Sequence, residues 1–172
     1  GPSATQRTQD ARHGGRQEGR PAHVDFSAEL VSGKRGAPDG RTLYFVKRVG
    51  KKYETRKNIY KTQIQDNGTW SDPVGISINT SGNEESPYTH PDGETFYFTS
   101  DGYPGLGGRD LFMVKIDSLG EFGEPINLGY PINSEAADFA LYELDETQGY
   151  FTSERKSENG EFKPDIYKYE LP

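Results

Sequence analysis

The sequence predicts an all-β protein made of repeated antiparallel sheets, and three observations lead to this class. A turn followed by a short aromatic strand occurs three times at a spacing of 53 residues, which gives Tyr44, Tyr97 and Tyr150 the same repeat position. Aromatic residues make up 12% of the chain, and 21 glycines and 11 prolines suit a fold with many turns. Repetition with a period near 50 residues is typical of β-propellers, whose blades are four-stranded sheets.

Residues 1–23 precede the repeats and differ in composition. They contain almost no apolar side chains, so they cannot bury enough surface to offset their ordering entropy. We therefore expect a disordered tail or linker. Gly1-Pro2 resembles the residue pair left after protease removal of a tag, so this segment is expected to lie next to a tag. Residues 1–24 have a charge balance of +2 within a net charge of -7, which leaves -9 for residues 25–172. This acidic balance argues against a nucleic-acid partner for the repeats.

The first repeat is expected at about residues 31–74. Asp39 and Gly40 form its turn, and Tyr44 and Phe45 belong to its aromatic strand. Trp70 opens a block that aligns with a fourth strand, and residues 24–30 align with the same block. The stretch before the first turn is about half as long as its counterpart before the second turn. Either the first blade lacks a complete first strand, or residues are missing before the turn.

The second repeat, at about residues 85–128, shows the blade most clearly. Asp92 and Gly93 supply its hairpin turn, because an Asp-Gly pair adopts the positive φ that such turns need. Tyr97 and Phe98 lie in the strand that follows, in which polar residues alternate with Phe96 and Phe98, the pattern of a half-buried strand. Strands are expected at residues 85–90, 94–100, 110–116 and 122–128, with a glycine-rich loop at residues 101–109.

The third repeat, at about residues 136–170, departs from the pattern at its turn, where Leu144-Asp145-Glu146 replaces Pro-Asp-Gly. Tyr150 and Phe151 lie in its aromatic strand, and a strand such as residues 24–30 would complete the blade. Three blades do not close a ring, because propellers have roughly 4–8. Two arrangements stay open: this chain is part of a longer propeller, or two chains exchange their N-terminal strands.

Residues 86–102, which include Pro91-Asp92-Gly93, resemble the PD40 repeat, a WD40-like module of TolB-type periplasmic proteins. Residues 105–112 and 125–133 and the ending Asp165-Ile166-Tyr167 are similar to PD40 propellers in bacterial envelope proteins. Those proteins also carry tetratricopeptide repeats and an OmpA-like peptidoglycan-binding domain, and some are linked to type IX secretion. The resemblance covers residues 26–172.

This resemblance implies a non-catalytic protein–protein interaction or scaffold module. It places the protein in the periplasm, or at the periplasmic face of the outer membrane, of a Gram-negative bacterium. The implied partners are other envelope proteins or domains of the same polypeptide, with a peptide or glycan ligand as a further option. No apolar run is long enough to span a membrane, so a membrane-spanning role is not expected.

The glycine-rich loop holds the best candidate for a binding site: Asp101, Tyr103, Arg109 and Asp110. Two carboxylates that bracket a flexible loop could bind Ca²⁺, which takes six to eight oxygen ligands. The alternative is structural, with the carboxylates accepting hydrogen bonds from the amides of the loop. The structural alternative is favoured, since the loop has neither the ligand spacing of an EF-hand nor a phosphate-binding motif.

Residue types that recur in every repeat are predicted to have structural roles, because a catalytic residue is needed only once. We expect one member of each aromatic pair to be buried, and Trp70 and Phe122 to pack between blades. The predicted structural positions are Asp39, Gly40, Tyr44, Phe45, Trp70, Asp92, Gly93, Tyr97, Phe98, Phe122, Tyr150 and Phe151.

Catalytic motifs are missing from the sequence. It has no cysteine, and His90 is the only histidine in the repeats, so a metal cluster or a Ser-His-Asp triad would depend on it. We therefore predict no enzyme activity, no metal and no cofactor. Two alternatives stay open: a propeller that binds or cleaves glycans with a carboxylate pair, and an accessory domain of a peptidase.

Overall fold

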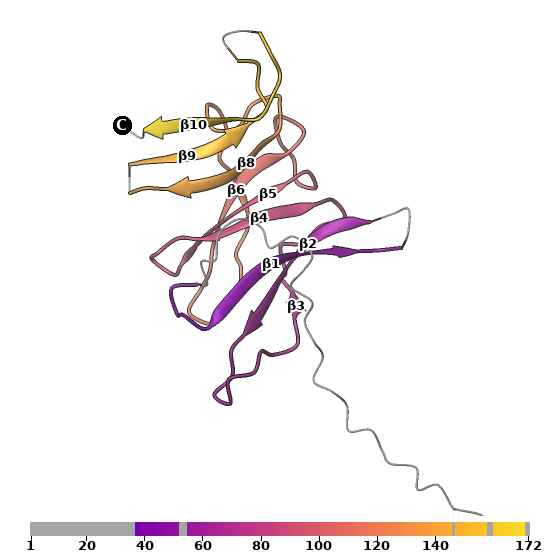
Figure 1. Cartoon of the computed structure of the whole chain (residues 1–172), viewed down its shortest axis with the longest axis vertical. Coiled ribbons are helices and arrows are strands. Elements are labelled where there is room, and N and C mark those ends of the chain that lie inside the picture. The colour runs from indigo at the N-terminus through magenta and orange to yellow at the C-terminus, as the bar shows by residue number, and fades with distance from the viewer. Residues whose placement is uncertain (1–36, 52–54, 146, 158–159, 171–172) are drawn as a thin grey trace, which may run out of the picture.

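The computed structural model describes residues 37–51, 55–145, 147–157 and 160–170 (Figure 1). In this part of the chain the all-β prediction is confirmed, because ten strands form three antiparallel sheets and no helix occurs. The predicted tail at residues 1–23, the strand at 24–30 and the start of the first repeat at 31–36 lie outside the described residues.

Each repeat contributes one sheet. The first sheet contains β1 (Thr42–Val49), β2 (Arg56–Gln63) and β3 (Val74–Gly75) in that order. The second contains β4 (Glu84–Thr89), β5 (Thr95–Ser100), β6 (Asp110–Lys115) and β7 (Ile126–Asn127). The third contains β8 (Asp138–Glu143), β9 (Gln148–Ser153) and β10 (Asp165–Glu170), with β9 in the middle. The register is the same in all three, since Tyr44, Tyr97 and Tyr150 lie opposite Lys61, Met113 and Lys168.

The fourth strand of the second repeat is much shorter than predicted. Instead of residues 122–128, only Ile126–Asn127 pairs with β6, and Phe122 makes a single bridge to Ile116. Pro125 has no amide hydrogen to donate to a ladder, which explains why regular pairing begins only after it.

The sheets stack in the order of the chain (Figure 1), with β1 and β2 against β4, and β4, β5 and β6 against β8. Strand β5 is buried on both faces, so the expectation of a half-buried strand is wrong there, because a sheet packs on each side of it. Phe96 and Phe98 belong to the apolar cluster that joins the first and second sheets. Tyr97 belongs to the cluster that joins the second and third sheets, together with Leu111 and Phe151.

Burial of the repeated aromatic residues differs between the three sheets. Phe98 and Phe151 are buried, whereas Tyr44 and Phe45 of the first sheet are both only half-buried, so the expectation fails there. The prediction that Trp70 packs between blades is wrong, since it is 40% exposed. Its counterpart Phe122 packs on the first sheet, and no described sheet lies on the corresponding side of Trp70.

Candidate functional site

The aspartates of the repeated turns hold the turns together. The Asp92 carboxylate accepts hydrogen bonds from the amides of Glu94 and Thr95 and from the Thr95 hydroxyl, at 2.7–2.8 Å. Asp39 and Asp145 bind the residues two and three positions further on in the same manner. Burial opposes the charge of Asp92, but its hydrogen bonds outweigh burial and hold the pKa of this carboxyl below its ordinary value. The neighbouring glycines, Gly40 and Gly93, have φ of 65° and 76°.

The two carboxylates of the glycine-rich loop fasten different segments. Asp101 accepts hydrogen bonds from the backbone and side-chain amides of Asn83, at 2.6 and 2.8 Å. Asp110, which is buried, accepts them from the amides of Leu106 and Gly107 and from Asn127 Nδ2. No group of three His, Cys, Asp or Glu residues in the described part of the chain is arranged to hold a metal ion. Both carboxylates therefore act as loop caps here.

The other two loop candidates also have intramolecular partners. The Tyr103 hydroxyl donates to the Ile78 carbonyl at 2.9 Å. The guanidinium of Arg109 lies 3.5 Å from Glu85 Oε1 and 5.3 Å from the centre of the Phe139 ring. The structure therefore does not bring the four candidate residues together around one open site.

Two asparagines that the sequence analysis missed connect successive sheets. Asn79 accepts from the Ile59 amide and donates to the Ile59 carbonyl, each at 2.8 Å. Asn133 does the same with Leu111. Each side-chain amide thus replaces a strand neighbour and fastens a linker to the preceding sheet. The sequence did contain a signal for them, because the pair Ile78-Asn79 recurs 54 residues later as Ile132-Asn133.

Two fully buried carboxylates begin the first strands of the second and third sheets. Asp138 of β8 forms an ion pair of 2.8 Å with Arg155, which also donates to the carbonyls of Pro131 and Ile132. Glu84 of β4 has no such cation among the described residues and accepts hydrogen bonds from the hydroxyls of Thr80 and Ser100. Gly102 occupies the position of Arg155, and a side chain there would collide with the Thr80 hydroxyl.

His90 lies in a polar chain between the second and third sheets. Its Nε2 is 3.3 Å from Glu143 Oε2, and its Nδ1 is 3.1 Å from Asp92 Oδ2. The Tyr97 hydroxyl donates to Glu143 Oε1 at 2.8 Å. Burial and this hydrogen bond to a carboxylate raise the pKa of Tyr97 above its ordinary value, so the phenol stays protonated. The arrangement connects two sheets and does not form a Ser-His-Asp triad.

The outer face of the third sheet, formed by Tyr150, Thr152, Ile166 and Lys168, is open to solvent. Ile166 is 72% exposed, whereas Leu111 and Ile59, its counterparts in the other sheets, are 0% exposed. Tyr150 is 39% exposed against 8% for Tyr97. The same face is therefore buried in the first two sheets and uncovered in the third.

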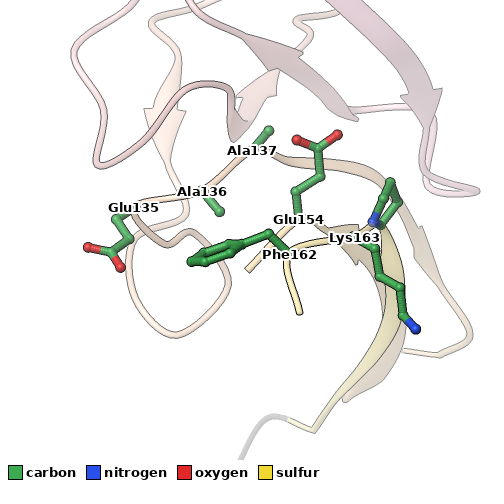
Figure 2. A pocket seen from close by; sticks show the side chains of 7 residues that line it. Glu135, Ala136, Ala137, Glu154, Phe162 and Lys163 are labelled. Atoms are coloured by element: carbon green, nitrogen blue, oxygen red, sulfur yellow. The ribbon is translucent and has the colours of Figure 1, made fainter. Parts of the chain in front are cut away.

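A pocket of about 610 Å³ opens between the linker before β8 and the loop that precedes β10 (Figure 2). Figure 2 shows the ring of Phe162 pointing toward the Glu135 side of the pocket, with the carboxylate of Glu154 and the amino group of Lys163 pointing away from the ring. The pocket is lined by Glu135, Ala136, Ala137, Glu154, Phe162, Lys163 and Pro164. None of these was singled out from the sequence, because their position in space depends on the packing of two distant loops.

Comparison with protein-family models finds no matching family, and searches of curated proteins and of solved structures find no significant match. Within the described residues, no helix is long and apolar enough to cross a membrane.

Proposed function

We propose that the three sheets are PD40-type blades of a β-propeller and that the chain is a non-catalytic protein–protein interaction or scaffold module. By the resemblance of its repeats, it belongs to an envelope protein on the periplasmic side of the outer membrane, of the kind linked to type IX secretion. Its partners are other envelope proteins or further domains of the same polypeptide.

The main observation in support of this proposal is the uncovered outer face of the third sheet. Its residues match, in register and in kind, the face that the second sheet buries against the third. Fully burying one isoleucine of this type contributes about 1.5–3 kcal/mol. Lys168 does not prevent packing, because Lys61 has the same position in the first sheet, beside the second. The face therefore suits a further sheet or a partner protein of similar shape.

Site-specific cross-linking tests the proposal. A photoreactive benzoylphenylalanine at Ile166 should form a cross-link in cells, either to a defined envelope protein or to a further domain of the same polypeptide, whereas the same group at Leu119, which is 83% exposed in a turn, should not. Equal capture at both positions, or none at Ile166, would contradict the proposed interface. Release of sugar from peptidoglycan fragments or oligosaccharides by the purified chain would instead establish the glycan-cleaving alternative.

A further inference from the structure

The geometry points to the pocket beside Phe162 as a binding site for a lysine or arginine side chain of a partner protein. This inference rests on the proposed function, since it names the ligand chemistry of a binding module. It concerns a surface other than the outer face of the third sheet, so the two can be tested separately.

The two carboxylates of the pocket have no intramolecular cation. Neither the Glu135 nor the Glu154 side chain makes a hydrogen bond or ion pair among the described residues. Glu154 is nevertheless half-buried, and its backbone is held to the linker because its amide donates to the Ala137 carbonyl at 2.9 Å. Lys163 does not neutralise them, since it forms an ion pair of 2.8 Å with Glu161. The pocket therefore has an excess of negative charge that a cation would complement.

Phe162 adds an exposed aromatic ring to the lining of the same pocket. Its side chain is 71% exposed, although Phe162 itself is fixed by a bridge to Lys156. An ammonium or guanidinium group against an aromatic face gains a cation–π interaction, and the carboxylates add charge-assisted hydrogen bonds. This combination favours a basic side chain over a neutral sugar or an anionic ligand.

The second repeat has a glycine in the place of Phe162. Three positions before the start of β6 stands Gly107, where a Cβ atom would lie 2.1 Å from the Ala136 carbonyl oxygen. The loop of the second repeat thus packs directly on the linker. Three positions before the start of β10 stands Phe162, whose ring borders open space on the other side of that linker (Figure 2).

Titration of the full ¹⁵N-labelled chain with blocked pentapeptides tests this inference. Gly-Gly-Lys-Gly-Gly and its Arg analogue should shift the amide resonances of Glu154 and Phe162, and added salt should weaken binding. The Gln analogue should not bind. Phe162→Ala should weaken binding by about 5-fold, and Glu154→Gln by about 10-fold. Tyr130→Ala removes another exposed aromatic ring and should have no effect.

Equal binding of the Gln peptide, or Lys-peptide binding that is unchanged in both pocket variants, would overturn the inference. Preferential binding of a peptidoglycan fragment at Phe162 would also overturn it, in favour of a glycan site. If the Lys peptide binds as expected but Ile166 captures no protein, the outer-face interface fails while the pocket stands. If Ile166 captures a protein but the Lys peptide does not bind, the inference about the pocket fails and the proposed function stands.

Discussion

Tyr97 and Tyr150 hold the same repeat position, but only Tyr97 is buried and bonded to a carboxylate of the next sheet. We expect Tyr97→Phe to lower the free energy of unfolding by about 1–3 kcal/mol, because half-buried Glu143 loses a hydrogen-bond donor. Tyr150→Phe is the matched control and should change it by less than about 0.5 kcal/mol. Urea denaturation of both variants measures the difference, and equal effects would contradict the assigned role of the hydroxyl.

Asp92 makes one turn sensitive to acid. Its pKa in the folded protein lies below the unfolded value of about 3.9, so its stabilising effect is present above pH 4 and is lost as the pH falls through the folded value. Asp92→Asn should therefore cost about 1 kcal/mol at pH 7. The difference in free energy of unfolding between Asp92→Asn and the parent protein should become smaller toward pH 3. Urea denaturation at pH 7 and pH 3 measures it, and the same difference at both pH values would contradict the electrostatic explanation. His90 and Lys115 also face this carboxylate, so both pH values should be measured at the same ionic strength.

At the level of elements, strand β5 is the centre of the packing. Phe98 is fully buried and stacks on Phe112 with ring centres 5.6 Å apart. Phe98→Ala should cost about 3–5 kcal/mol through lost burial and the cavity that remains. Phe45→Ala, at the equivalent position in β1, should cost clearly less because Phe45 is only half-buried. Thermal and urea unfolding would show this, and similar losses in both variants would contradict the central role of β5.

The glycine-rich loop gives a prediction about ligand addition. Because Asp101 and Asp110 already accept hydrogen bonds from separate segments, millimolar Ca²⁺ should leave the melting temperature unchanged. Differential scanning calorimetry with Ca²⁺ and with a chelator measures this. A rise in melting temperature that disappears in Asp101→Ala would show that the loop binds the ion after all.

The features of the fold that the sequence predicted correctly are those that depend on adjacent residues. The turn at Asp92-Gly93 and the presence of a strand after it could be predicted, because φ preference and strand composition are properties of adjacent residues. The burial of both faces of that strand could not, since alternation predicted a half-buried strand. The exposure of Trp70 could not, since it depends on which sheet lies beside it. The pocket beside Phe162 could not be predicted either, because the linker before β8 and the loop before β10 are distant in sequence and meet only in the folded third sheet.

At the level of the whole molecule, the first and third sheets at the two ends of the stack raise the question of how many chains assemble. The chain has a mass of 19.2 kDa. We expect light scattering to give this mass if the sheets belong to a longer propeller, which is the arrangement we favour. A mass near twice that value would support two chains that exchange strands. Mass spectrometry of the intact polypeptide is the control, because a heavier chain would show that further repeats exist.

The side-chain amides of Asn79 and Asn133 bear on how the protein folds. Each needs the backbone of the preceding sheet before its own linker can be fixed, so the position of every later sheet depends on the one before it. Sheets coupled only to their neighbours behave as a one-dimensional series, in which order spreads from a nucleus and is lost first at the ends. The second sheet, with a neighbour on each side, is therefore the expected nucleus, and the first and third sheets are expected to open first.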